Sequence, residues 1–225
     1  MIPLIGFVGD KKSGKTMVLK AVLAELAKKG RKVGVIKHTA HGFDLDRPNT
    51  DSFMLKESGA TKVAMLGHDE IAVYGAAKPE PGPEQVRDIY LADLDVVLIE
   101  GFKDAQIPKI LIAATKPIPP WGKETSGLIA VVSKDKPDFA VKHIRPGSTK
   151  EIIKLIEWYV KTHRQKREVN VYLDGKKLQM KPFIKDFLLN TIVGMVGSLN
   201  NAQGAKRISI SIDFPEGVSV PLPGE

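Results

Sequence analysis

Residues 9–16 combine a glycine-rich turn with a lysine and a hydroxyl at a spacing that binds phosphate. They read GDKKSGKT, a complete G-x-x-x-x-G-K-[ST] motif. Glycines allow successive backbone N–H groups to turn toward phosphate oxygens, and the helix that follows adds the positive end of its dipole. In this motif the lysine reaches the β- and γ-phosphates, and the last hydroxyl is a Mg²⁺ ligand. The expected binding residues are Gly9, Asp10, Lys11, Lys12, Ser13, Gly14, Lys15 and Thr16.

The segments on either side of this loop are those that the motif requires. An apolar run over 2–8 predicts a buried strand, and the pattern over 15–29 predicts a helix that stops at Gly30. The order strand, loop, helix distinguishes a nucleotide-binding loop from an incidental glycine-rich turn. We therefore expect a nucleoside triphosphate and Mg²⁺ at this loop.

A second polar segment, 36–46, follows a strand predicted over 32–37 and contains His38 and His41. Ligands of open α/β sheets bind outside the carboxyl ends of the strands, so we expect both histidines to line that crevice. Asp51, a little further on, is a candidate Mg²⁺ ligand, and it fits equally well as the N-cap of a helix over 51–58. His38 and His41 lack a third convergent ligand, which makes a transition-metal site a weak alternative.

Glu100 follows the most hydrophobic strand candidate, 95–99, which we expect at the centre of the sheet. Beside a phosphate loop, an acidic residue at a strand's end is typical of the Walker B carboxylate that lies close to Mg²⁺. The alternative is a solvated glutamate that simply ends the strand. We expect Lys15 and Glu100 to be catalytic, and Thr16, Asp51 and Glu100 to surround the metal.

Two further side chains are candidates for contacts at the same edge. Asp135 follows a strand predicted over 128–132 and could accept the N1 and N2 donors of guanine, although its spacing departs from N-K-x-D. Trp121 lies in the proline-rich loop 116–122, where it is either a partner contact or a hydrophobic plug over the sheet edge.

Composition excludes several kinds of chemistry. The chain has 225 residues, 43% of them hydrophobic, and no cysteine, so disulfides, thiolate zinc sites and cysteine nucleophiles are excluded. It has neither the basic start of a signal peptide nor an apolar run of about eighteen residues, and we expect a cytoplasmic protein with no membrane partner. The net charge is +8, and 142–168 is strongly basic. The aromatic residues of that basic stretch, Trp158 and Tyr159, are adjacent and do not alternate with the basic residues, so we do not expect nucleic acid as a partner.

The order of predicted elements indicates an α/β fold with a P-loop NTPase three-layer sandwich and a mostly parallel sheet over 1–165. Further strands are expected over 109–113 and 128–132, a hairpin over 62–66 and 70–74, and helices over 84–92 and 148–163. A small C-terminal α+β unit follows over 168–225. Its pattern predicts a hairpin over 169–173 and 177–180, an apolar helix over 183–199 and a strand over 207–212.

The chain resembles the molybdopterin-guanine dinucleotide biosynthesis protein B family, the MobB family. Four stretches carry the resemblance in the same order: 9–16, 35–46, 51–60 and 99–110. The resemblance covers about 1–163 and implies a P-loop fold of the dimeric signal-recognition/MinD-like class, GTP binding with weak hydrolysis, and an adaptor role. The implied partners are GTP, a MobA-like molybdopterin guanylyltransferase, molybdopterin and a second copy of the chain. Residues 168–225 extend past the minimal family domain, and we expect them to serve dimerisation or partner docking.

Two other functions stay open at this point. A P-loop small-molecule kinase would need arginines in a lid near the γ-phosphate, and Arg87 and Arg145 are the mid-chain candidates. A nucleotide-gated metallochaperone of the same structural class is disfavoured because cysteine and histidine-rich tracts are absent. No arginine finger or water-positioning residue is evident, so we expect slow Mg²⁺-dependent hydrolysis of GTP.

Overall fold

The structure is a computed structural model that describes residues 2–39, 42–43, 46–163, 169–174, 176–199, 205 and 207–212. The chain divides into two compact units, Met1–Lys166 and Arg167–Glu225. The first unit carries the phosphate loop. No helix in the described ranges is long and apolar enough to cross a membrane.

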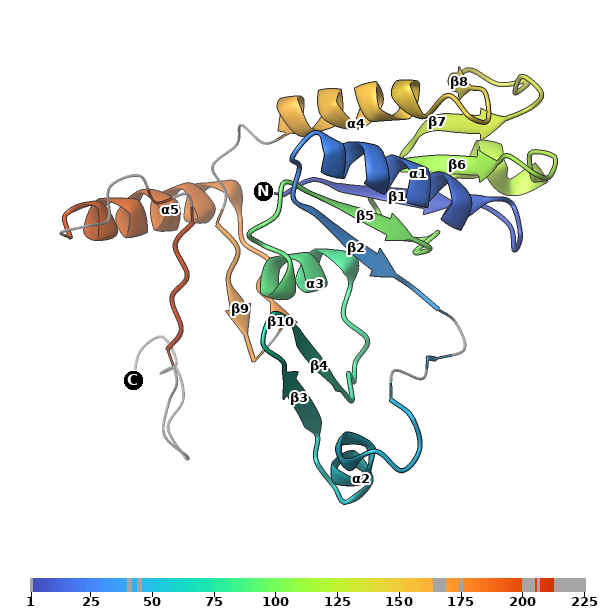
Figure 1. Ribbon diagram of the computed structural model, residues 1–225. Coiled ribbons are helices and arrows are strands. Elements are labelled where there is room, and N and C mark those ends of the chain that lie inside the picture. The colour runs from blue at the N-terminus through green and yellow to red at the C-terminus, as the bar shows by residue number, and fades with distance from the viewer. Residues whose placement is uncertain are drawn as a thin grey trace. The chain divides into compact units, whose positions relative to one another are not determined.

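The first unit is built on a six-stranded parallel sheet with the order β2-β5-β1-β6-β7-β8 (Figure 1). The predicted α/β architecture with a mostly parallel sheet is confirmed. Strand β5 lies inside the sheet between β2 and β1, but it is second from the edge because β6, β7 and β8 extend the other side. The short, partly polar β8 was not predicted. The strands are β1 (Leu4–Val8), β2 (Val33–Lys37), β5 (Val96–Glu100), β6 (Lys109–Ala113), β7 (Leu128–Ser133) and β8 (Lys142–Ile144).

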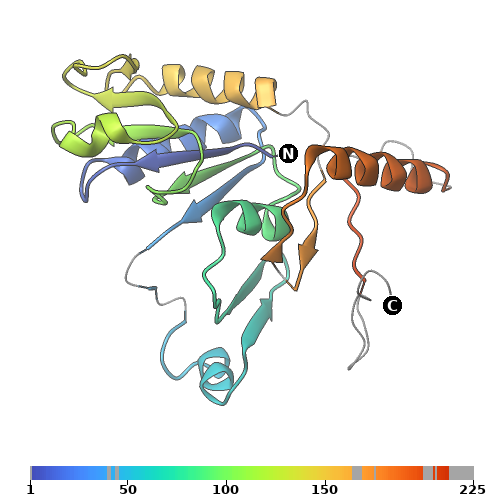
Figure 2. The ribbon, with the colours of Figure 1, turned by 180° about the vertical axis from the view of Figure 1, so that it is seen from behind.

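Alternate side chains of the strands pack on opposite faces of the sheet. On one face, Phe7, Leu98 and Ile110 pack with apolar residues of α1 (Lys15–Lys28) and α4 (Thr149–His163). On the other face, Leu4, Val97 and Ile99 pack with residues of α3 (Pro83–Tyr90) and of the segment 101–108. Both faces of the sheet are therefore shielded from solvent, which explains why the inner strands are apolar at successive positions. Figures 1 and 2 show α1 and α4 side by side on one face.

The connection from β5 to β6 contains no helix. A parallel crossover usually carries one, but here 101–108 runs across the sheet as irregular chain. The fully buried Lys109 anchors this segment, because its ammonium donates hydrogen bonds to the backbone carbonyls of Ala105 and, at 2.7 Å, Ser126. Burial lowers the pKa of Lys109, and the nearby carboxylate of Asp104 opposes that shift. This buried lysine performs a fastening role that its sequence position did not suggest.

An insertion between β2 and α3 carries a short helix, α2 (Asp51–Glu57), and an antiparallel hairpin of β3 (Lys62–Leu66) and β4 (Ile71–Gly75). The hairpin was predicted with nearly these bounds. The N-cap of α2 is Thr50, whose hydroxyl accepts the Phe53 N–H at 3.3 Å, so the expectation that Asp51 caps this helix is wrong. Thr50 has the extended backbone that an N-cap requires, and Asp51 already lies in the first turn.

The second unit contains the short hairpin β9 (Tyr172–Leu173) and β10 (Lys176–Lys177) and the helix α5 (Pro182–Gly197). The predicted hairpin and helix are present, and Gly175 of the predicted turn lies outside the described residues. The predicted strand over 207–212 is wrong: these residues are described and form no strand. An alternating apolar pattern becomes a strand only where a neighbouring strand pairs with it, and no described strand does so.

Replacement of Lys109 by alanine tests its fastening role. We expect Lys109→Ala to lower the free energy of unfolding by about 1–3 kcal/mol, because the carbonyls of Ala105 and Ser126 would lose their charged donor. Urea denaturation followed by circular dichroism measures this loss. Lys161→Ala, an exposed lysine of α4, is the matched control and should change stability by less than about 0.5 kcal/mol. Equal effects of the two substitutions would contradict the assignment.

Candidate functional site

The phosphate loop turns tightly against the end of β6. A β-carbon at Gly9 would lie 2.3 Å from the carbonyl oxygen of Ile112 and 2.6 Å from the Ser13 hydroxyl, so only glycine fits there. The backbone then turns at Lys12, which has a left-handed φ of 62° and whose carbonyl accepts a 2.7 Å hydrogen bond from the Thr115 hydroxyl. Such a conformation costs roughly 1 kcal/mol for a non-glycine residue. The loop is thus held in its shape by contacts to the neighbouring strand's end.

The Ser13 side chain is enclosed within the phosphate loop. The residue is buried, and its hydroxyl has no hydrogen-bond partner among the described residues. Its carbonyl accepts hydrogen bonds from Ala114 N–H at 3.0 Å and Thr115 N–H at 3.3 Å. Ser13 therefore fastens the loop to the residues that follow β6 through its backbone carbonyl.

Lys15 folds back onto the loop that it follows. Its ammonium donates hydrogen bonds to the carbonyls of Gly9 at 3.0 Å and Asp10 at 2.8 Å. Partial burial lowers the pKa of Lys15, the carboxylates of Glu100 and Asp10 raise it, and Lys116 lowers it further. An ammonium that is partly desolvated and bound only to neutral carbonyls would gain a stronger, charge-assisted partner in a phosphate oxygen.

Thr16 and Glu100 meet across the loop, although they are far apart in the sequence. The Thr16 hydroxyl donates a 2.9 Å hydrogen bond to Oε1 of Glu100. Glu100 ends β5, which pairs with β1 in the register Phe7 to Glu100, so the sheet itself brings the carboxylate beside the loop. The structure thus brings together three of the predicted residues: Lys15, Thr16 and Glu100.

His38 also lies at this edge, as the sequence predicted. The backbone N–H of His38 donates to the Glu100 carbonyl at 2.9 Å. The imidazole ring stacks on Phe102 with centroids 4.2 Å apart, and its Nε2 lies 2.9 Å from Oε1 of Glu80. Gly101 passes directly beneath it, because a β-carbon there would lie 3.0 Å from Cβ of His38. The ring therefore joins the Glu100 turn to the chain that follows the β3–β4 hairpin. His41 lies outside the described residues.

A third contact at the loop was not predicted. The Trp121 indole N–H donates to Oδ1 of Asp10 at 3.2 Å, and the Lys103 ammonium lies 3.8 Å from the centre of the Trp121 ring. Trp121 also packs with Ile118 on the cluster of Val8, Leu111 and Val131, as a hydrophobic plug would. Its sequence signal, one tryptophan in a proline-rich loop, indicated a covering role but not the contact with Asp10.

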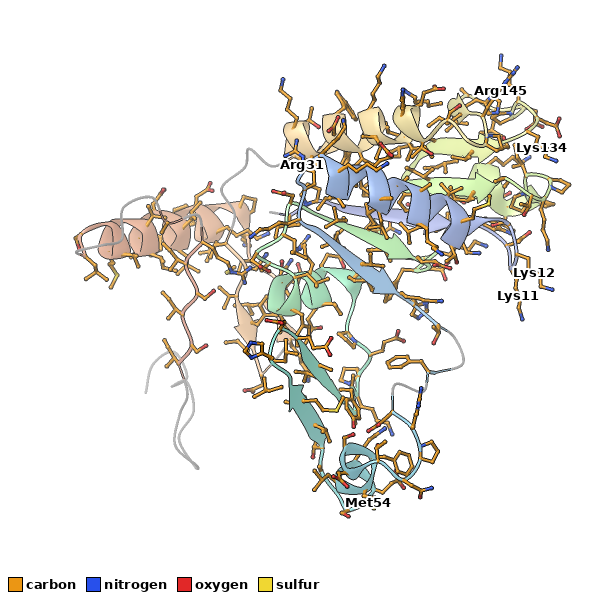
Figure 3. All side chains as sticks on the ribbon, viewed as in Figure 1. Lys11, Lys12, Arg31, Met54, Lys134 and Arg145 are labelled. Carbon is orange, nitrogen blue, oxygen red and sulfur yellow. The ribbon has the colours of Figure 1, made fainter. Side chains whose placement is uncertain are left out.

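The candidate base-binding segment is held by hydrogen bonds of Ser133 and His143. The Ser133 hydroxyl donates to the Asp135 carbonyl at 2.7 Å, and Nε2 of His143, from the unpredicted β8, lies 3.0 Å from the Ser133 carbonyl oxygen. The Asp135 side chain is exposed. Lys134 and Arg145 lie at the same edge of the sheet as Lys11 and Lys12 (Figure 3). This edge is therefore basic beyond the phosphate loop itself, which favours an anionic ligand.

Other predicted residues are not brought to the loop. Figure 1 shows α2, which carries Asp51, at the end of the hairpin insertion and away from the phosphate loop. No group of three His, Asp or Glu side chains in the described ranges is placed to hold a metal ion. Arg87 is buried in α3, where it contacts Asp88 at 2.7 Å and the Ile2 carbonyl at 3.4 Å, so it is no lid residue.

The hairpin insertion has its own electrostatic anchor at Asp46. Its carboxylate accepts hydrogen bonds from the Tyr74 hydroxyl and, at 2.7 Å, the Thr50 hydroxyl. These bonds, that of Tyr74 first, lower the pKa of Asp46 from 3.8 to about 2, and the same contact raises the pKa of Tyr74. Because the folded pKa is depressed, the stabilisation is present above pH 3.8 and is lost as the pH falls through about 2.

Tyr74→Phe removes the largest contribution to this shift. We expect the pKa of Asp46, followed by carboxyl-carbon NMR titration, to rise from about 2 toward 3.8 in this variant. Tyr90→Phe, an exposed tyrosine of α3, is the control and should leave the titration of Asp46 unchanged. An Asp46 that titrates identically in wild type and Tyr74→Phe would show that the contact is absent in solution.

Comparison with known proteins identifies the chain's family. The sequence model of the family described as molybdopterin guanine dinucleotide synthesis protein B matches residues 4–134. A molybdopterin-guanine dinucleotide biosynthesis adapter protein of Haemophilus influenzae is 39% identical over 127 residues, which are 52% of this chain and 68% of that protein. A relative from Methanocaldococcus jannaschii is 26% identical over 93% of this chain and 97% of its own length.

A solved structure shares the fold. The crystal structure of a molybdopterin-guanine biosynthesis protein B (mobB) superposes with a TM-score of 0.58 at 24% identity, over 70% of this chain and 99% of that one. The sequence match covers the phosphate loop, the Glu100 turn and the end of β7 as far as Lys134, and it stops one residue before Asp135. The chain therefore belongs to the molybdopterin guanine dinucleotide synthesis protein B family, MobB.

Proposed function

We propose that this protein binds GTP with Mg²⁺ at the 9–16 loop, hydrolyses it slowly, and acts as an adaptor in the synthesis of the guanine dinucleotide form of the molybdenum cofactor. The observation that supports the nucleotide part is the 2.9 Å hydrogen bond from the Thr16 hydroxyl to Glu100, which joins the last residue of the phosphate loop to the acidic residue at the end of β5. The adaptor part is supported by the family and by the name of the Haemophilus influenzae relative.

The oxygen donors at this contact suit Mg²⁺. Mg²⁺ in nucleotide sites is held by one or two protein oxygens together with substrate phosphates and water, not by a cage of several carboxylates. The Thr16 hydroxyl and the Glu100 carboxylate supply such oxygens, and the described residues offer no larger acidic cluster. When bound, Mg²⁺ would offset the negative charge of the β- and γ-phosphates.

Lys15 would change partners when the nucleotide binds. In the present structure it donates to the Gly9 and Asp10 carbonyls, both in the loop that would surround the phosphates. A bridging position between β- and γ-phosphate oxygens would replace these neutral acceptors by charged ones. The same ammonium would then offset the charge that develops on the bridging oxygen during hydrolysis.

Preference for guanine would rest on Asp135. An exposed carboxylate at the end of β7 can accept two donors from guanine, N1–H and the N2 amino group, whereas adenine lacks a donor at N1. The hydrogen bonds of Ser133 and His143 fix the backbone around this residue. The segment is therefore suited to select one base.

The adaptor role requires surfaces for a partner, which we propose is a MobA-like molybdopterin guanylyltransferase. Helix α5 has no buried residue in the chain by itself, and Phe183, Phe187 and Met195 are exposed along it. A helix this apolar is normally covered. We propose that α5 serves partner docking or homodimerisation.

The first test of the proposal is calorimetric titration with GTP and with ATP, each with Mg²⁺. We expect GTP to bind more tightly than ATP, because only guanine offers paired donors to Asp135. Lys15→Ala should abolish GTP binding, whereas Lys20→Ala, an exposed lysine on the same helix, should leave it unchanged. A preference for ATP would contradict the proposed selection of guanine by Asp135. If Lys15→Ala bound GTP as tightly as wild type, the 9–16 loop would not be the nucleotide site.

The role of Glu100 can be separated from that of Lys15 by varying Mg²⁺. We expect Glu100→Gln to weaken GTP binding roughly tenfold with Mg²⁺ present, since an amide holds the ion and its water less well than a carboxylate. Without Mg²⁺ the substitution should have little effect or a favourable one, because a negative charge near the phosphates is removed. Loss of binding that is independent of Mg²⁺ would instead assign Glu100 a structural role.

A further inference from the structure

The segment after Glu100 places a second ammonium next to the phosphate loop. Gly101 and Phe102 both have left-handed φ values, 106° and 52°, and they turn the chain sharply away from β5. The next residue, Lys103, has an exposed side chain whose ammonium lies 3.8 Å from the centre of the Trp121 ring. The Trp121 indole is itself bonded to Asp10 of the phosphate loop. One aromatic side chain thus separates Lys103 from the loop.

We propose that the Lys103 ammonium contacts the γ-phosphate of the bound nucleotide and assists its hydrolysis. When the nucleotide is absent, this ammonium rests on the Trp121 ring. This inference rests on the proposed function. It supplies what the sequence analysis lacked, namely a positive group from outside the loop itself.

The relative strengths of the two contacts allow Lys103 to move. A cation–π contact at an exposed site is weak, whereas a charge-assisted hydrogen bond to a phosphate is among the stronger polar contacts in proteins. A lysine side chain has four rotatable bonds, so its ammonium can leave the ring without backbone movement. A γ-phosphate held by Lys15 would therefore compete successfully with the ring for this ammonium.

Other lysines near the loop are less suited to this task. Lys11 and Lys12 lie at the tip of the loop and extend outward from it (Figure 3). Lys116 influences the pKa of Lys15 but follows β6, on the opposite side of the loop from Glu100. Of these lysines, only Lys103 follows β5, the strand that carries Glu100. The turn after β5 would therefore place both the Glu100 carboxylate and the Lys103 ammonium near the phosphates.

In the hydrolytic step, the oxygen of a water molecule bonds to the γ-phosphorus while the bond from that phosphorus to the bridging oxygen breaks. The electron pair stays on the β-phosphate of GDP, and the water loses one proton to solvent as inorganic phosphate forms. Lys103 would offset charge on the γ-phosphate oxygens throughout this step, which is where fixed positive groups accelerate phosphoryl transfer most.

The test compares Lys103→Met with Lys103→Arg and with Lys123→Met, an exposed lysine near Trp121 in the helical turn Pro120–Glu124, as the matched control. We expect Lys103→Met to slow single-turnover GTP hydrolysis by about 30- to 100-fold. It should also reduce the preference for a non-hydrolysable GTP analogue over GDP by about tenfold, with the affinity for GDP unchanged. Lys103→Arg should retain most of both properties, and Lys123→Met should behave as wild type.

Tryptophan fluorescence gives an independent readout. The chain has two tryptophans, so Trp158→Phe leaves Trp121 as the reporter. We expect the GTP analogue, but not GDP, to change the emission of Trp121 as the ammonium leaves the ring, and Lys103→Met to abolish that difference.

Three outcomes overturn the inference. One is an unchanged hydrolysis rate and unchanged analogue preference in Lys103→Met. Another is an equal loss of affinity for GDP and the analogue, which would mark Lys103 as a general phosphate-attracting charge. The third is a wild type that binds neither guanine nucleotide, which would refute the proposed function as well. Because the analogue preference needs no turnover, slow hydrolysis does not prevent the test.

Discussion

The parallel pairing of β1 with β5 is the constraint on which the candidate site depends. Its register sets Phe7 opposite Glu100, so the phosphate loop and the acidic turn leave the sheet next to each other. Short contacts then join the elements at this edge: the Thr16 hydroxyl donates to the Glu100 carboxylate, and the backbone N–H of His38, which follows β2 on the other side of β5, donates to the Glu100 carbonyl. A slip in that register would separate the hydroxyl from the carboxylate by one residue and turn alternate side chains to the wrong face.

The two faces of this sheet are built differently, and the difference serves the site. One face is covered by the regular helices α1 and α4, which bury a continuous apolar cluster. The other is covered by α3 and by irregular chain, including the 101–108 crossover that Lys109 fastens. Irregular chain costs hydrogen-bonding partners, and the buried lysine compensates by donating to two carbonyls. It also lets Gly101, Phe102 and Lys103 adopt the turns that a helix would forbid.

Much of the fold could be predicted because the inner strands are apolar on both faces and the loops between them contain strong turn residues. The phosphate loop, Glu100 and His38 were all predictable, since each directly follows a recognisable strand. The contacts of Trp121 and Lys109 could not be predicted, because they depend on which loops the strand order brings together. The strand expected over 207–212 failed for a related reason: alternation in Ile208, Ile210 and Ile212 shows only that a strand is possible if a partner exists.

The β3–β4 hairpin has a further physical consequence. On one of its faces Leu66, Ile71 and Val73 are exposed, with Leu66 80% accessible, and both of its edges carry unpaired backbone groups in the described structure. A short, apolar, two-edged hairpin is the kind of segment that seeds intermolecular cross-β stacking. Lys62 at one end and Asp69 and Glu70 at the turn provide the charges that oppose such stacking. The hairpin is therefore one apolar surface at which copies of the protein can associate in concentrated solution, and a single added charge at Leu66 would oppose that association.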